Sequence, residues 1–287
     1  MNNSNKIIKQ LTRIADALDR MVPPLKSNQF LKNSNTYEWF AKEQILNPIK
    51  EVNRVKLDLL LGINKNKEII IQNTLQFANN LPANNVLLWG ARGMGKSSLV
   101  KAVHLYVRNF TQNDLILIEI HKNEIDSLPN LIRLLSNEKK QFIIFCDDLS
   151  FEYGEQTYKA LKSLLDGGIE KKSDNILFYA TSNRRHLIAR NIVENEKQNA
   201  IHESEVVEEK ISLSDRFGIS LGFYSCSQKD YYTIVKAYSE EYKLNISNQD
   251  LEQLSIKWSI ARGSRSGRVA WQFIQDLAGK LEQKLKP

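Results

Sequence analysis

Short runs of apolar residues, separated by longer amphipathic stretches, make up the middle of the chain. Five of these runs are Val86–Trp89, Leu115–Ile120, Phe142–Cys146, Ile176–Ala180 and Ile219–Tyr224. They are continuously apolar, which is typical of strands that are buried on both faces of a sheet. Strands that alternate with helices form parallel βαβ units. The pattern therefore predicts an α/β fold with a five-stranded parallel sheet and helices on both of its faces.

Both ends of the chain have helical periodicity instead. Residues 6–22 place apolar side chains at three- and four-residue spacing, which predicts an amphipathic helix. This helix fits a packing element or a frayed arm better than the alternative, a contact for a partner or a neighbouring subunit. Residues 37–80 also look mostly helical, and helical spacing returns after Tyr224. We expect three domains: a helical N-terminal extension over residues 1–50, an α/β domain over 51–224 and an all-helical domain over 225–287.

A glycine-rich segment directly follows the first apolar run. It fits the pattern G-x-x-x-x-G-K-[ST] at every fixed position and consists of Gly90, Ala91, Arg92, Gly93, Met94, Gly95, Lys96 and Ser97. Glycines let the backbone curl so that its N–H groups point at phosphate oxygens, and the next helix aims its positive end at the same anion. Lys96 is expected to reach the β- and γ-phosphates, and the Ser97 hydroxyl to ligate Mg²⁺. With Ser98, the segment predicts a nucleotide-binding loop.

An acidic pair follows the third apolar run. Asp147 is expected at the carboxyl tip of a buried strand, where ligand sites of α/β proteins form. A carboxylate there can hold Mg²⁺ directly or through water. Asp148 is next in line to orient an attacking water as a general base. The competing interpretation, an acidic turn after a strand, is weaker beside a complete phosphate loop.

The composition is that of a folded protein, because 42% of the 287 residues are hydrophobic and 25% are charged. This excludes a wholly disordered chain and a disulfide-stapled miniprotein. The net charge of +7 lies at the two ends, without any block of five like charges, so nucleic acid is an allowed but not a favoured partner. With two cysteines and no apolar stretch near the ~20 residues of a membrane span, we expect a reducing, cytoplasmic location and no membrane partner.

Taken together, these motifs make the chain resemble the AAA+ ATPases. The resemblance runs in order from about residue 57 to the end, and is strongest to a family of predicted bacterial AAA+ ATPases whose biological role is undefined. The stretches that carry it are Leu57–Ile63, Leu87–Leu99, Ile143–Leu149, Ala180–Leu187 and Ser212–Gly218. The resemblance implies ATP and Mg²⁺ as cofactors, a helical lid at the C-terminal end and a homo-oligomer.

The resemblance also implies roles for residues beyond the phosphate loop. Asn183 is similar to the sensor that hydrogen-bonds the γ-phosphate or the attacking water, where an amide can donate and accept without adding charge. Arg216 is similar to an arginine finger, which enters a neighbouring subunit's site and neutralises charge on the transferred phosphoryl group. By themselves, Asn183 would be a strand-end turn and Arg216 a surface ion-pair partner, for instance of Asp215.

Two further parts of the chain are implied to contact the nucleotide. Arg268 is similar to the second sensor, which reaches the γ-phosphate from the lid. Arg265 is a nearby alternative, and the loop that holds it could equally be a solvated basic loop. Gly62 and Ile63 resemble the segment that lines the adenine pocket, although ordinary core packing explains them nearly as well.

One position departs from the common pattern of the AAA+ superfamily. The acidic motif usually ends in Asp-Glu, whereas this chain has Asp147-Asp148. The shorter side chain sets the carboxylate about 1.5 Å further back, and a misplacement of that order can cost about 10²-fold in rate. Glu152 and Glu155 are near enough in sequence to substitute.

The resemblance therefore implies an Mg²⁺-dependent ATPase that hydrolyses ATP at subunit interfaces to change the conformation of an unidentified client. Asp148, Asn183, Arg216 and Arg268 would be its catalytic residues, and Ser97 and Asp147 its metal ligands. Two alternatives stay open. One is a nucleotide-dependent binding module that turns over slowly or not at all, and the other is a DNA-directed loader or helper ATPase.

Overall fold

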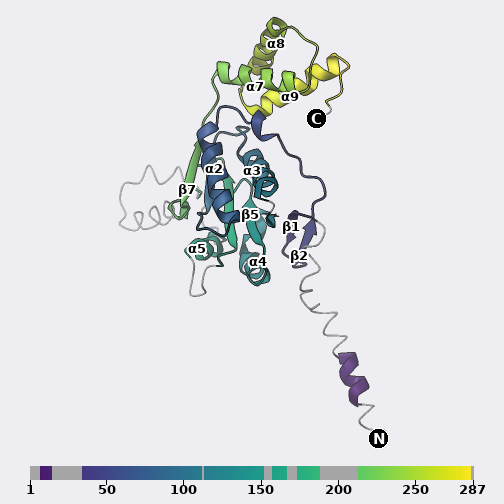
Figure 1. Cartoon of the computed structure of the whole chain (residues 1–287), viewed down its shortest axis with the longest axis vertical. Helices are drawn as coiled ribbons and strands as arrows, with labels where there is room; N and C mark the ends of the chain where they lie inside the picture. Colours follow the sequence, from purple (N-terminus) through teal and green to yellow (C-terminus); the bar gives the residue numbers. More distant parts are fainter. Residues whose placement is uncertain are drawn as a thin grey trace, which may run out of the picture.

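A mostly parallel sheet forms the centre of the molecule. The structure, a computed structural model, describes residues 7–14, 34–111, 113–151, 157–166, 173–187 and 213–285. Within these ranges, seven strands form one sheet in the order β2-β1-β4-β5-β6-β3-β7 (Figure 1). The strands are β1 (Thr36–Phe40), β2 (Ile45–Pro48), β3 (Val86–Gly90), β4 (Leu115–Ile120), β5 (Gln141–Cys146), β6 (Ile176–Ser182) and β7 (Ile219–Phe223).

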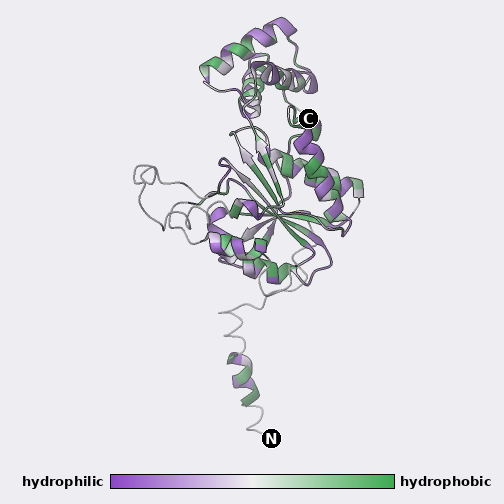
Figure 2. Cartoon of the chain, turned by 90° about the vertical axis from the view of Figure 1, so that its left-hand side faces the viewer, coloured by the Kyte–Doolittle hydropathy of each residue, from purple (hydrophilic) through white to green (hydrophobic). Residues whose placement is uncertain are grey.

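The five strands expected from the apolar runs are all present, as β3 to β7. Every pairing among them is parallel, which confirms the predicted α/β fold. All residues of β5 and β6 are buried, as expected for central strands covered on both faces. Hydrophobic residues accordingly run along these strands (Figure 2).

The helical expectation is wrong for residues 37–48, which form most of β1 and all of β2, and the sheet has seven strands rather than five. β1 pairs parallel with β4 and antiparallel with β2, so a hairpin extends the sheet at that edge. Tyr37 and Trp39, two residues apart, are both fully buried, and the Trp39 indole N–H donates to the Ser127 hydroxyl at 2.7 Å. This alternation was the strand signal, but it spans only five residues.

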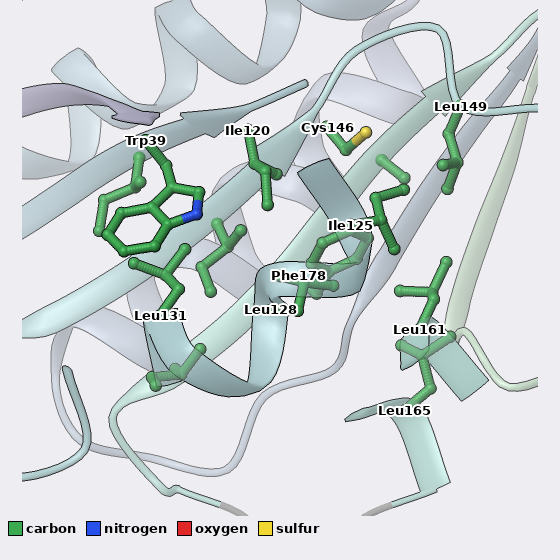
Figure 3. Close-up of a cluster of buried hydrophobic side chains, with 14 of the residues drawn as sticks. Trp39, Ile120, Ile125, Leu128, Leu131, Cys146, Leu149, Leu161, Leu165 and Phe178 are labelled. Carbon is green, nitrogen blue, oxygen red and sulfur yellow. The ribbon is translucent and has the colours of Figure 1, made fainter. Parts of the chain in front are cut away.

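Helices cover both faces of the sheet. On one face lie α2 (Asn64–Ala78) and α3 (Lys96–Thr111), which share a hydrophobic cluster with Leu88 of β3. On the other face lie η2 (Lys122–Ser127), α4 (Leu128–Leu135) and α5 (Tyr158–Asp166). They pack in a second cluster with Trp39, Leu87 and Phe178, shown in part in Figure 3. Leu87 and Leu88, neighbours in β3, thus point into the two different clusters, so the strand is packed between two layers of helices.

The chain after β7 is helical and packs around a third cluster. Its helices are α7 (Gln228–Glu241), α8 (Asn248–Ala261) and α9 (Gly267–Lys280). Each begins at a serine whose hydroxyl accepts the backbone N–H three residues later; these serines are Ser227, Ser247 and Ser266. Leu59 of η1 (Leu57–Leu59), the segment before α2, belongs to the same cluster. The helices α7 to α9 are therefore joined to the α/β part in two ways, by the chain that continues from β7 and by packing against η1.

At the N-terminal end, the structure describes one stretch of helix, residues 7–14. Its apolar side chains Ile7, Ile8, Leu11 and Ile14 are 55–61% exposed. The rest of the helix predicted for residues 6–22 lies outside the described residues. In the described part of the chain, no helix has both the length and the apolar character that crossing a membrane requires.

Buried His104 is expected to make the stability of the fold depend on pH. It lies on α3, is 1% exposed, and its Nε2 is 3.1 Å from the carbonyl oxygen of Leu115. Burial lowers the pKa of His104 from 6.5 to about 4, against the opposing effect of the hydrogen bond to Leu115. The unfolded chain binds this proton more readily, so stability is full above about pH 6.5 and falls by roughly 3 kcal/mol as the pH drops to about 4.

The variant His104→Gln has no titratable group at this position. We expect its free energy of unfolding, measured by urea denaturation between pH 7 and pH 4, to lose that part of the pH dependence. The same slope in both proteins would show that His104 does not carry the effect.

Candidate nucleotide site

The polar motifs meet at the carboxyl edge of the sheet. β3 leads into the Gly90–Ser97 loop, β5 leads into Asp147 and Asp148, and β6 ends just before Asn183. These strands are parallel and adjacent in the order β5-β6-β3, so their carboxyl ends lie side by side. Ligand sites of α/β proteins form at this edge. The structure therefore brings the phosphate loop and the acidic motif together.

The phosphate loop is curled and held against β7. Three of its glycines, Gly90, Gly93 and Gly95, have positive φ angles of 124°, 73° and 87°. The backbone N–H of Ala91 donates to the carbonyl oxygen of Phe223 at 2.7 Å. A Cβ on Gly90 would lie 2.1 Å from that same oxygen, so only glycine fits there. Backbone geometry, rather than side chains, sets the shape of the loop.

Lys96 is buried at the base of the loop, with 7% of its surface exposed. Its ammonium donates to the carbonyl oxygens of Gly90 and Ala91, each at 2.8 Å. It also donates to the side-chain oxygen of Asn183 at 3.2 Å. The lysine thus links the loop that follows β3 to the residue that follows β6.

Three cations gather at the loop. Burial lowers the pKa of Lys96; the carboxylates of Asp147 and Asp148 oppose this change, while Arg268 and Arg92 add to it. Arg92 and Arg268 are exposed. A buried ammonium with two further guanidinium groups within electrostatic reach is an arrangement that a polyphosphate neutralises.

Asp147 and Ser97 fit a magnesium ion. The Ser97 hydroxyl donates to the Asp147 carboxylate at 2.5 Å, and the Thr181 hydroxyl donates to the same oxygen. Hydroxyl and carboxylate oxygens are hard ligands that Mg²⁺ takes together with water and phosphate oxygens. No group of three or more His, Cys, Asp or Glu side chains among the described residues can hold a metal by itself. The donor set therefore fits a metal that arrives with a phosphate.

Asp148 has a left-handed backbone, with a φ angle of 52°. Its backbone N–H donates to the Thr181 hydroxyl oxygen at 3.0 Å, and its carboxylate accepts from the Asn183 amide. Because Asn183 also accepts from Lys96, hydrogen bonds run from Lys96 through Asn183 to Asp148. An amide in this place can orient a water or a phosphate oxygen lying between the two charges.

Thr181 is a site residue that the sequence analysis did not single out. It lies in β6, is 1% exposed, and its hydroxyl contacts both aspartates. In the sheet register Cys146 is opposite Ala180, which sets the next residues, Asp147 and Thr181, side by side. The sequence offers one signal, a hydroxyl residue in an apolar strand two positions before Asn183, but it does not show the register that places Thr181 beside Asp147.

The lid contacts the phosphate loop through the start of α9. The backbone N–H of Arg268 donates to the carbonyl oxygen of Gly93 at 3.2 Å. A Cβ on Gly93 would lie 2.8 Å from the Ser266 hydroxyl oxygen and 3.0 Å from Arg268 Cβ. This contact places Arg268 beside the loop, while Arg265 lies in the exposed turn before the helix.

An apolar wall lies on the other side of the loop. Gly62, with a φ angle of 77°, turns the chain just before α2. Ile63 is 8% exposed and shares a cluster with Leu60 and Met94. Leu60 Cδ2 is 3.4 Å from the position that a Cβ on Gly95 would take. The segment predicted to line an adenine pocket thus packs against the loop.

Three residues predicted at this site remain, Ser98, Glu152 and Glu155. Ser98 lies in the first turn of α3 and is partly buried. Glu152 and Glu155, the possible substitutes for Asp148, lie outside the described residues.

Arg216 lies at the opposite edge of the sheet. β7 runs parallel to β3, with Ile219 opposite Val86 at the start of both strands. Arg216 precedes β7, so the five residues of that strand, about 16 Å, separate it from the carboxyl edge. Its Nε donates to the carboxylate of Asp166 at the end of α5. The structure therefore does not bring Arg216 to the phosphate loop of its own chain.

The sequence matches one protein-family model over most of its length. The model described as "Protein of unknown function (DUF815)" matches residues 32–281. No curated protein matches.

Solved structures share the fold at low sequence identity. The RuvB Holliday junction branch migration motor of Thermotoga maritima is 17% identical, with a TM-score of 0.51 over 80% of this chain and 68% of that chain. A point mutant of the same RuvB is 16% identical, with a TM-score of 0.52 over 81% and 69%. The Aeropyrum pernix ORC1 protein, solved in complex with DNA, is 13% identical, with a TM-score of 0.55 over 80% and 66%. RuvB and ORC1 are AAA+ ATPases, so this chain has the AAA+ fold.

The contact between Gly93 and α9 predicts that Gly93→Ala loosens the lid. An alanine there meets the start of α9 and must adopt a left-handed backbone, a strain of roughly 1–2 kcal/mol. We expect amide hydrogen exchange in the first turn of α9 to become about tenfold faster.

Gly279→Ala, in the same helix, is the matched control. A Cβ on Gly279 meets nothing within 4 Å, so this variant should not accelerate exchange at the start of α9. Equal exchange in the two variants would contradict the coupling between loop and lid.

Proposed function

Because the chain belongs to the DUF815 family and has the AAA+ fold, we propose that it is an Mg²⁺-dependent ATPase that works at interfaces between copies of itself. Hydrolysis would move the lid and thereby change the conformation of a client protein. The observation that carries the proposal is the line of hydrogen bonds from Lys96 through Asn183 to Asp148, next to a curled phosphate loop.

The residues at the carboxyl edge of the sheet would have different roles in the reaction. Loop N–H groups, Lys96 and Arg268 bind the phosphates, while Ser97 and Asp147 would hold Mg²⁺, which neutralises charge on the phosphate oxygens. The oxygen of a water molecule, oriented by Asn183, attacks the γ-phosphorus. Asp148 takes its proton, and the bond from the γ-phosphorus to the bridging oxygen breaks. ADP and inorganic phosphate leave.

The position of Arg216 supports action between copies. Arg216 and the phosphate loop lie at opposite edges of the same sheet, farther apart than an arginine side chain reaches. A guanidinium from a second copy would therefore complete the charge neutralisation that one copy lacks. Finger residues of this kind are worth roughly 10³–10⁵ in rate where measured.

Two single variants separate binding from turnover. Lys96→Ala removes the buried ammonium and is expected to abolish ATP binding in calorimetry. Arg216→Ala leaves the phosphate loop intact, so we expect ATP binding to persist while the steady-state ATPase rate falls by about 10³-fold.

Mixing the two variants tests whether Arg216 acts in a neighbouring copy. Each variant alone is expected to have little or no ATPase activity, but a mixed assembly joins the intact loop of Arg216→Ala with the intact finger of Lys96→Ala. We expect part of the ATPase activity to return on mixing. Equal rates in the wild type and Arg216→Ala would defeat the finger assignment, and no recovery on mixing would defeat action between copies.

The short side chain of Asp148 favours a second candidate, a nucleotide-dependent binding module with little or no turnover. A single-turnover assay separates the two. For the ATPase, we expect fast release of phosphate in the wild type and a loss of about 10²–10⁴-fold in Asp148→Asn, which keeps the shape and tolerates the left-handed backbone. Slow release that is equal in both proteins would favour the binding module.

A further inference from the structure

We propose that Thr181 is a positioning residue that holds Asp148 in its left-handed turn, and that this turn compensates for the short side chain at position 148. The inference rests on the proposed function, because it assigns Asp148 as the proton acceptor. It concerns a residue outside the phosphate loop and outside the acidic motif.

The hydroxyl of Thr181 acts both as a hydrogen-bond donor and as an acceptor. Its O–H donates to the Asp147 carboxylate, and its oxygen accepts the backbone N–H of Asp148 at 3.0 Å. Thr181 is 1% exposed, so its hydroxyl is shielded from water on the side of β6. One hydroxyl thus fixes a carboxylate and the backbone of the residue that follows it.

The backbone of Thr181 already joins the two strands. Its carbonyl oxygen accepts the N–H of Leu149 at 2.7 Å, which pins the chain on the far side of Asp148. The N–H of Asp148 also lies 3.2 Å from the Asp147 carboxylate, a longer contact within its own turn. The backbone of Thr181 thus attaches the segment at Leu149, and its hydroxyl adds a separate hydrogen bond to the backbone of Asp148 itself.

The left-handed turn explains why an aspartate stands at position 148. Among residues other than glycine, Asp and Asn are several-fold enriched in this conformation, because a short polar side chain tolerates it. The turn also redirects the Cα–Cβ bond, and the carboxylate then accepts from Asn183. The backbone thus directs a carboxylate that lacks one methylene toward the residue that orients the water.

The same geometry leads to an expectation for the variant Asp148→Glu. Replacing Asp148 with glutamate, the residue of the common superfamily pattern, should not improve the enzyme. In the left-handed turn, Asp148→Glu would push the carboxylate past Asn183, and we expect a lower turnover than in the wild type.

The experiment compares three variants of the full chain. Thr181→Val keeps the branched shape but removes the hydroxyl, and Thr181→Ser restores the hydroxyl. Thr74→Val is the matched control, since Thr74 is also a fully buried threonine, but its hydroxyl bonds Ile70 and Tyr179 away from the site. Each protein is measured by amide hydrogen exchange at Asp148 without nucleotide, by single-turnover hydrolysis at saturating ATP and Mg²⁺, and by calorimetry with ATP.

For Thr181→Val we expect about tenfold faster exchange at the Asp148 amide and a single-turnover rate lower by about 10- to 100-fold, the loss expected for misplacing a reacting group by about 1 Å. ATP affinity should stay within about threefold, because the change acts on the chemical step. Thr181→Ser should recover most of the rate, and Thr74→Val should change neither the exchange at Asp148 nor the rate.

A double variant shows whether Thr181 acts through Asp148. Once Asp148→Asn has removed the proton acceptor, adding Thr181→Val should cost no further rate. A full additional loss would mean that Thr181 acts elsewhere, for example through Asp147, and would overturn the proposal. Unchanged exchange at Asp148 in Thr181→Val would overturn it as well. If the wild type neither binds nor hydrolyses ATP, the proposed function fails, and the exchange measurement still decides whether Thr181 holds the turn.

Discussion

The hydrogen bond from the Ala91 N–H to the Phe223 carbonyl is the constraint on which the site depends. It ties the phosphate loop to the last strand at a distance that only glycine at position 90 permits. β7 leads directly into the lid, and the lid returns to the loop through the backbone contact between Arg268 and Gly93. The loop is therefore bonded through main-chain atoms both to β7 and to the start of α9.

The sequence was sufficient wherever a feature is local. Strands β3 to β7 could be predicted because strands buried on both faces are continuously apolar, and the phosphate loop because its glycines and Lys96 follow one another in the chain. β1 was missed because its signal is one short alternation of Tyr37 and Trp39, preceded by a polar stretch. Its burial depends on pairing with β4, which is distant in sequence.

The site residues divide in the same way. The sequence could place Asp147 and Asp148 at this edge because they are the first and second residues after a strand. The resemblance supplied Asn183, which follows the neighbouring strand, and parallel strands present such positions at one edge. Their roles in catalysis remain proposals. Thr181 was not predicted because its role comes from the register between β5 and β6, and from a backbone conformation at Asp148 that no residue pattern announces. In the proposed role, the hydrogen bond from Thr181 and the left-handed backbone at Asp148 together compensate for the short acidic side chain.

If Arg216 acts in the site of a neighbouring copy, as proposed, each copy has one surface that donates the guanidinium and another that receives it. Association of this kind is heterologous: the surface that offers the guanidinium differs from the surface that receives it, so copies add in one direction and either close into a ring or continue as a helical filament. An open row has one terminal loop without a donor, whereas a closed ring has none. A closed ring would therefore have one more complete ATP site than an open row with the same number of copies, whatever that number is.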